Sequence, residues 1–148
     1  MTKAIIVYGS TTGNTELLSD YVADAMRDSG LDVTVRNVTD SDVYDLYGYD
    51  IIVLGSSSWG GGELQDDFID FYDEMEGLFL GGKKAAAFGP GDGSYETFCK
   101  AVDLLENRLK ECGADVVTPS LRVDGDVKAA KDRAYEWGRQ LARSLAIA

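Results

Sequence analysis

The chain has 148 residues, of which 45% are hydrophobic, and this size suits one domain with a sizeable core. Its formal net charge of −12 makes nucleic acids and anionic membranes poor partners, although charge alone does not distinguish steering of a basic protein partner from simple solubility. The absence of histidine excludes His-based acid–base catalysis and His-bound metal sites. No run of about 18 apolar residues occurs, so we predict no membrane-spanning helix.

The charge is unevenly distributed along the chain. Residues 1–82 hold 3 basic and 16 acidic side chains, whereas residues 83–148 hold 11 basic and 10 acidic ones. The first residues, 1–3, run straight into a predicted strand without a signal peptide, so we expect a cytoplasmic protein. Cys99 and Cys112 match no CxxC redox or zinc spacing, and we expect both to be small buried hydrophobic side chains.

Strand and helix signals alternate along the chain. Apolar runs predict strands at residues 3–8, 33–35, 51–55 and 84–89, and a fifth strand split by Pro119 into 115–117 and 121–123. Helical spacing predicts helices at about 14–29, from about 63, at about 98–112 and at about 126–145, with a short helix or turn at 41–47. Gly30 is a predicted C-cap, and residues 90–93 form a breaker cluster. The pattern predicts an α/β three-layer sandwich with a parallel sheet, as one domain over residues 1–148.

The turn at residues 9–15 joins the first predicted strand to the first predicted helix. Backbone N–H groups at a helix start lack internal partners and lie at the positive end of the helix dipole, so such a turn binds anions. The turn has neither the lysine of a Walker loop nor GxGxxG spacing, which favours one terminal phosphate over a polyphosphate. A helix cap rich in Ser and Thr remains the alternative. Its short polar side chains are those of Ser10, Thr11, Thr12, Asn14 and Thr15.

Two further loops leave the carboxyl ends of predicted strands, where ligands of such sheets bind. The loop at 56–62 places Trp59 between three serines and three glycines, which favours a ligand contact over a local hydrophobic plug. The loop at 89–95 ends in Tyr95, which is weaker evidence because a Tyr in the first turn of a helix often only covers the core. One phosphate site and two aromatic side chains predict a phosphorylated, planar aromatic ligand. Trp137 lies on an apolar helical stripe, and we expect it in the core.

Motifs in these three loops resemble those of the flavodoxin family. They are IIVYGSTTGNTE at residues 5–16, SSWG at 57–60 followed by ELQDDF at 63–68, and FGPGDGSYETFC at 88–99. The resemblance spans the whole chain and is strongest to the short-chain flavodoxins of sulfate-reducing bacteria. It implies a five-stranded parallel sheet in the order 2-1-3-4-5 and one noncovalently bound FMN.

The resemblance also implies a function and a set of cofactor-binding residues. The protein would be a low-potential one-electron carrier, not an enzyme, and would cycle FMN between semiquinone and hydroquinone. It would act as a monomer on redox proteins with a basic docking face. Tyr95 would stack on the flavin ring opposite Trp59, and Cys99 would contribute its backbone. The implied FMN-binding residues are Ser10, Thr11, Thr12, Gly13, Asn14, Thr15, Ser57, Ser58, Trp59, Gly60, Gly61, Gly89, Pro90, Gly91, Asp92, Tyr95, Thr97, Phe98 and Cys99.

Two departures from the family pattern fall in the ring-binding loops. Only Gly61 and Gly62 stand where relatives usually carry an acidic pair and two further residues, so this loop is shorter and less acidic. Pro90 stands where the family often has Cys, and Gly93 where it often has Ser. Because proline has no N–H, any ring contact by that amide in relatives has no counterpart in this chain.

Other functions that suit this architecture fit the residues less well. A receiver domain would need carboxylates after the first strand, which instead ends in Tyr8 and Gly9. A small phosphatase would need Cys-x5-Arg, which neither cysteine provides. A flavin-binding module without electron transfer stays open. So does a flavodoxin-like reductase domain, although we expect no second domain for a nicotinamide cofactor.

Overall fold

A computed structural model describes residues 2–10, 13–59, 63–91 and 100–146 of the chain. Buried apolar runs form the strands at the centre of the molecule. All strand pairs of the main sheet are parallel, in the order β2-β1-β3-β6-β7, with β8 beside the carboxyl half of β6. Since β7 and β8 are two halves of one split strand, the predicted order 2-1-3-4-5 is confirmed. The strands are β1 (Lys3–Gly9), β2 (Asp32–Asn37), β3 (Ile51–Ser56), β6 (Lys84–Gly91), β7 (Asp115–Val116) and β8 (Leu121–Asp124).

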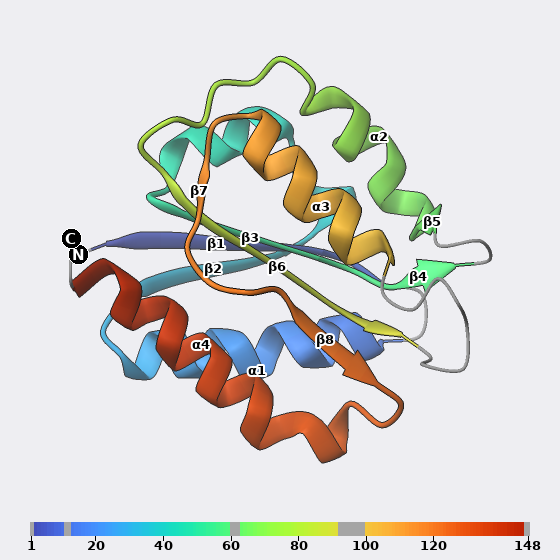
Figure 1. Cartoon of the computed structure of the whole chain (residues 1–148), viewed down its shortest axis with the longest axis vertical. Helices are drawn as coiled ribbons and strands as arrows, with labels where there is room; N and C mark the ends of the chain where they lie inside the picture. Colours follow the sequence, from blue (N-terminus) through green and yellow to red (C-terminus); the bar gives the residue numbers. More distant parts are fainter. Residues whose placement is uncertain (1, 11–12, 60–62, 92–99, 147–148) are drawn as a thin grey trace.

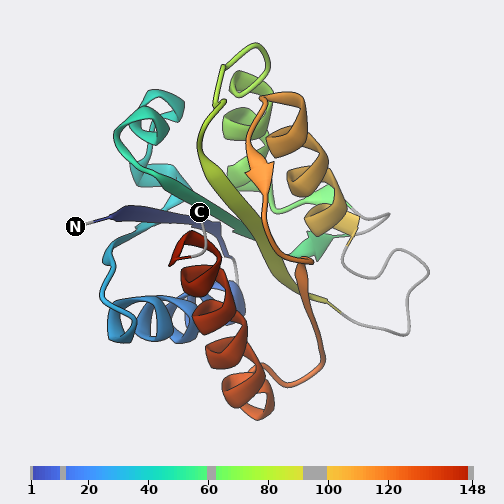
Figure 2. The ribbon, with the colours of Figure 1, turned by 60° about the vertical axis from the view of Figure 1, so that its left-hand side comes forward.

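Helices cover both faces of this sheet, which confirms the predicted three layers (Figures 1 and 2). The helices α1 and α4 lie side by side on one face, and α2 and α3 cover the other (Figure 1). Three short 3-10 helices and a two-stranded antiparallel ribbon complete the described fold. The elements are α1 (Asn14–Asp28), α2 (Asp66–Glu74), α3 (Lys100–Glu111), α4 (Lys131–Ala146), η1 (Val38–Asp40), η2 (Val43–Gly48), η3 (Lys128–Ala130), β4 (Ser58–Trp59) and β5 (Glu63–Leu64).

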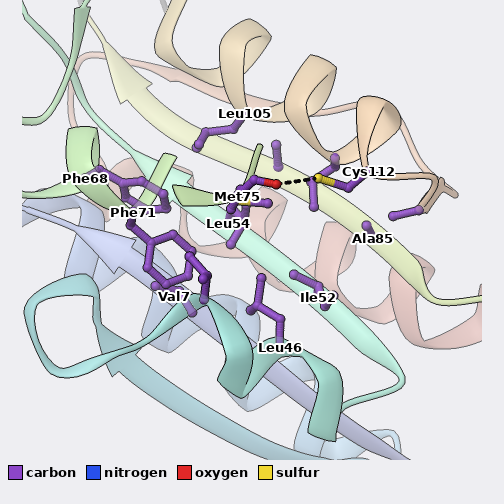
Figure 3. Packing of buried hydrophobic residues seen from close by; sticks show 14 of the residues in the cluster. Val7, Leu46, Ile52, Leu54, Phe68, Phe71, Met75, Ala85, Leu105 and Cys112 are labelled. Carbon is purple, nitrogen blue, oxygen red and sulfur yellow. Dashed lines mark hydrogen bonds between the residues drawn. The ribbon is translucent and has the colours of Figure 1, made fainter. Parts of the chain in front are cut away.

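The alternation of side chains along the strands divides the core into two clusters. On one face Val7 and Leu54 pack with Phe68 of α2 and Leu105 of α3 (Figure 3). In the same cluster the buried Cys112 thiol donates to the Met75 carbonyl at 3.3 Å, as expected of a small buried side chain (Figure 3).

The cluster on the other face packs the sheet against α1 and α4. It contains Ile6, Val53, Leu18 and Trp137. The Trp137 side chain is 7% exposed, and its indole N–H donates to the Pro119 carbonyl at 2.8 Å. The core placement predicted for Trp137 is therefore confirmed.

The structure moves several predicted boundaries. The helix expected from about residue 63 begins at Asp66, because residues 63–64 form β5. The strand expected to end at Gly89 continues to Gly91, since β8 pairs with that end of β6. The helix expected at 126–145 begins with the 3-10 turn η3, and the turn at 41–47 is the 3-10 helix η2.

The expected glycine cap at the end of α1 is confirmed. Gly30 has a φ of 93°, and its N–H donates to the Arg27 carbonyl at 2.9 Å, so it is the glycine that ends α1. In the part of the chain that the structure describes, we find no helix both long enough and apolar enough to cross a membrane.

Candidate functional site

The first two predicted loops start from neighbouring strand ends. Gly9, the last residue of β1, is the register partner of Ser56, the last residue of β3. The next helix after β1 is α1, on one face of the sheet, whereas the next after β3 is α2, on the other (Figure 2). The sheet therefore has its topological switch point between these strands, and ligands of open α/β sheets bind at that position.

The turn before α1 has the geometry of an anion site. Gly13 adopts φ 90° and ψ −8°, a left-handed conformation that favours glycine, and its N–H donates to Ser10 Oγ at 3.0 Å. The helix begins at Asn14, and the Leu17 N–H donates to the Gly13 carbonyl at 3.0 Å. The N–H groups of the first turn point out of the helix without intrahelical acceptors, at the positive end of its dipole.

Thr15 provides the observation that capping alone does not explain. Its side chain is 1% exposed, and Oγ1 has no hydrogen-bond partner among the residues that the structure describes. The Thr15 carbonyl, by contrast, accepts from the buried Ser19 hydroxyl at 2.8 Å. An unsatisfied buried hydroxyl costs about 1–3 kcal/mol. A phosphate oxygen at the start of α1 would satisfy it, so the residues present fit the phosphate of FMN.

The second loop is built on the short ribbon of β4 and β5. Ser58 pairs with Leu64 and Trp59 pairs with Glu63, so the segment 60–62 joins the two strands. Ser56 Oγ accepts from the Gln65 N–H at 3.0 Å, and the Ser56 hydroxyl donates to the Ser57 carbonyl at 2.9 Å.

Neither Ser56 nor Gln65 is among the cofactor-binding residues predicted from the sequence. Both side chains are buried, at 0% and 3% exposed. The available signal is position: Ser56 ends a buried strand, and Gln65 directly follows the apolar Leu64. That signal does not identify the hydrogen bond between them, which depends on how the ribbon folds.

The third loop leaves β6 beside the end of β3. A Cβ on Gly89 would lie 2.2 Å from the Ser56 carbonyl oxygen and 2.7 Å from Val102 Cγ2, so only glycine allows this approach of two backbones. Pro90 pairs with Val123 of β8, and the register with β3 ends earlier, at Phe88.

The structure therefore places part of the predicted set. The strand ends and turns that carry these residues lie together at the carboxyl end of the sheet. The residues placed are Ser10, Gly13, Asn14, Thr15, Ser57, Ser58, Trp59, Gly89, Pro90 and Gly91. The residues Thr11, Thr12, Gly60, Gly61, Asp92, Tyr95, Thr97, Phe98 and Cys99 lie outside the described part of the chain.

Burial and neighbouring carboxylates both raise pKa values near this end of the sheet. Burial, and then the Glu16 carboxylate, raise the pKa of the Tyr8 hydroxyl. Burial, and then Glu16 and Asp24, raise the pKa of the Asp20 carboxyl. Within the described residues, no group of three or more acidic or thiol side chains is arranged to hold a metal ion.

An acidic groove of about 400 Å³ lies between η1 and α2. Four exposed carboxylates of α2 line this groove, and all four belong to the acid-rich half of the chain, residues 1–82. They belong to Asp66, Asp67, Asp70 and Glu74.

Comparison with known proteins agrees with this geometry. A family model described as Flavodoxin matches residues 6–138. A flavodoxin of Maridesulfovibrio salexigens is 50% identical over 148 residues, covering 98% of this chain and 100% of that protein, and one of Nitratidesulfovibrio vulgaris is 40% identical with the same coverage. The crystal structure of oxidised Flavodoxin 1 from Bacillus cereus is 36% identical with a TM-score of 0.90, covering 96% of this chain and 98% of that one. The chain therefore belongs to the flavodoxin family, whose members bind FMN and carry electrons.

Proposed function

We propose that the protein is a low-potential one-electron carrier that holds FMN noncovalently and cycles it between semiquinone and hydroquinone. The observation that best supports cofactor binding is the buried Thr15 hydroxyl, which has no hydrogen-bond partner among the described residues. FMN, when bound, supplies two successive one-electron reductions, and the protein binds it, orients it and tunes its potentials. The protein acts as a carrier and not as an enzyme.

The proposed phosphate site is the turn before α1. The N–H groups of the first helical turn and the Thr15 hydroxyl donate to phosphate oxygens. The side chain of Ser10 already accepts from the Gly13 N–H, and this bond holds the turn in shape. The proposed phosphate-binding residues are Ser10, Thr11, Thr12, Gly13, Asn14 and Thr15.

The proposed ring site is formed by the loops after β3 and β6. Trp59 and Tyr95 cover the two faces of the flavin, and backbone groups meet its edges. Pro90 offers no N–H to the ring. The proposed ring-binding residues are Ser57, Ser58, Trp59, Gly60, Gly61, Gly89, Pro90, Gly91, Asp92, Tyr95, Thr97, Phe98 and Cys99.

The acidic half of the chain favours a low second potential. One carboxylate about 12 Å from the flavin, at an effective dielectric constant of about 60, costs an added negative charge about 0.5 kcal/mol. Several such charges lower the second potential by about 100 mV, since a tenfold change in a one-electron equilibrium is about 59 mV. The same charge, −12 over the chain, favours redox partners with a basic docking face.

A visible spectrum of the purified protein during stepwise anaerobic reduction tests the proposal. A yellow protein that passes through a blue intermediate before bleaching supports one-electron transfer. A yellow protein that bleaches directly keeps the flavin but contradicts the carrier cycle. A colourless protein that gains no visible band with added FMN contradicts the whole proposal. The turn before α1 would then be only a helix cap.

A further inference from the structure

One buried hydroxyl, that of Ser56, connects the two ends of the segment between β3 and α2. Ser56 Oγ accepts from the Gln65 N–H at 3.0 Å and donates to the Ser57 carbonyl at 2.9 Å. The first bond joins residues nine apart in sequence, at the two ends of the ribbon-bearing segment 57–64, whereas the second joins adjacent residues. Ser56 is 0% exposed and Gln65 is 3% exposed, so water does not compete for these bonds.

The Gln65 side chain extends the same connection to the end of β1. A Cβ built on Gly9 would lie 2.6 Å from Gln65 Oε1, so the amide fills the space beside that glycine. Oε1 also accepts from the Asp67 N–H at 3.0 Å, and Nε2 donates to the Asp67 carboxylate at 3.1 Å. The amide is thus bonded to the start of α2 and lies close to the end of β1, the strand that leads into the phosphate turn.

The ribbon needs such an anchor because its own pairing is short. Each of its strands has two residues, and an isolated two-stranded ribbon is only marginally stable in water. Its connecting segment, 60–62, consists of three glycines, which lose more conformational entropy on ordering than other residues. Contacts at the base of the ribbon therefore carry much of its positioning.

We propose that Ser56 and Gln65 are positioning residues that set the flavin potentials by fixing the ribbon against the ends of β1 and β3. We call these two residues, with the hydrogen bonds above, the Ser56–Gln65 clamp. The clamp acts through the strands β4 and β5, and β4 carries Trp59, one of the proposed ring contacts. This inference rests on the proposed function, because it concerns the same bound FMN. The opposing interpretation is that the clamp stabilises the fold and leaves the cofactor unaffected.

The test compares Ser56→Ala with Cys112→Ala in the FMN-loaded protein. Ser56→Ala removes the acceptor of the Gln65 N–H, whereas Cys112→Ala removes a buried bond to the Met75 carbonyl in the same core cluster. We expect Ser56→Ala to raise the FMN dissociation constant about tenfold and to lower the formation constant of the half-reduced flavin about tenfold, which narrows the gap between the two potentials by about 59 mV. Cys112→Ala lowers the melting temperature but changes neither quantity.

A second readout uses the FMN-free protein. Amide hydrogen exchange of residues 57–65 is expected to accelerate about tenfold or more in Ser56→Ala and to stay unchanged in Cys112→Ala. If Ser56→Ala lowers only the melting temperature, and both potentials and the FMN affinity match the wild type, the clamp is purely structural and the inference is wrong. The wild type is measured first. If the wild-type chain binds no FMN, the proposed function is wrong, and the inference that rests on it is wrong as well.

Discussion

At the scale of single residues, the proposed role of Thr15 in phosphate binding conflicts with the stability of the fold. Its hydroxyl is buried at 1% exposure without a partner among the described residues, while its carbonyl is bonded to Ser19. A buried polar group left unsatisfied is the kind of local conflict that folds retain at binding sites. We therefore expect removal of this hydroxyl to have opposite effects on the stability of the fold and on FMN binding.

Thr15→Val removes the hydroxyl and keeps the shape. We expect the FMN-free protein to gain about 1 kcal/mol of unfolding free energy, and FMN binding to lose about 1.5–3 kcal/mol, the range for a hydrogen bond to a charged group. Urea unfolding and fluorescence titration measure the two effects. Riboflavin, which has no phosphate, should bind both proteins equally.

The matched control for this substitution is Thr118→Val, at a threonine that is 9% exposed and lies outside the phosphate turn. It should leave FMN affinity unchanged. Equal FMN affinity in Thr15→Val and the wild type would remove the Thr15 hydroxyl from the phosphate site.

Gly89 illustrates how closely two strand ends approach at the site. Gly89→Ala would place a Cβ 2.2 Å from the Ser56 carbonyl oxygen, a main-chain atom that cannot rotate away. We expect a loss of about 1–3 kcal/mol of unfolding free energy, typical of overpacking. Thermal unfolding measures it, with Gly48→Ala as control, because a Cβ on Gly48 meets no atom within 4 Å. Similar stability of the two variants would contradict the close approach.

At the scale of secondary-structure elements, the sequence predicts most of the fold but not the elements that depend on pairing. The strand β3 is fully buried, β1 is buried after its first residue, Lys3, and α1 has a periodic apolar stripe, so the apolar pattern suffices to find them. The ribbon of β4 and β5 has two residues per strand, too few for any period.

The same limit applies to the candidate site. The turn before α1 was predicted from its residue types, since a glycine-rich, hydroxyl-rich turn between a strand and a helix has a distinctive composition. The bond between Ser56 and Gln65 was not predicted, because it exists only once the ribbon between them has folded. Likewise, Pro90 suggested a break in the strand, but pairing with β8 on one side allows β6 to continue through it.

The helix α1 carries a ladder of like charges that lowers its stability. Glu16, Asp20 and Asp24 follow one another at i, i+4 spacing, and like charges at that spacing are destabilising. Burial, and then these two neighbours, raise the pKa of the Asp20 carboxyl above its ordinary value of 3.8, and Arg27 offsets this in part. The charged form of Asp20 is therefore disfavoured in the folded state.

Asp20→Asn should raise the unfolding free energy at pH 7 by about 0.5 kcal/mol. A raised folded-state pKa means that wild-type stability is complete below the ordinary pKa and is lost as pH rises through the folded one. The advantage of the variant should therefore vanish at low pH, where Asp20 is protonated in both states, and shrink in 1 M salt. Urea unfolding across pH measures it, and a difference that grows on acidification would contradict the argument.

At the scale of the whole molecule, the negative charge is concentrated in the first half of the chain. Residues 1–82, with 16 of the 26 acidic side chains, include α1 and α2 on opposite faces of the sheet. The exposed acids of α2 line the groove beside η1, close in sequence to the proposed ring-binding loop. A basic redox partner steered by this field would approach the end of the sheet where we propose that FMN binds.

This arrangement predicts which acids steer a partner. We expect the rate of electron transfer to a basic c-type cytochrome, measured by stopped flow, to fall about 10- to 100-fold between 0.01 M and 0.5 M salt as the field is screened. At low salt, Asp70→Asn with Glu74→Gln on α2 should slow association about two- to fivefold, and the difference should disappear at high salt. The control pair, Asp132→Asn with Glu136→Gln on α4, makes the same change in net charge on the other face of the sheet. Equal slowing by both pairs would mean that net charge alone attracts the partner, and that the α2 face does not direct it.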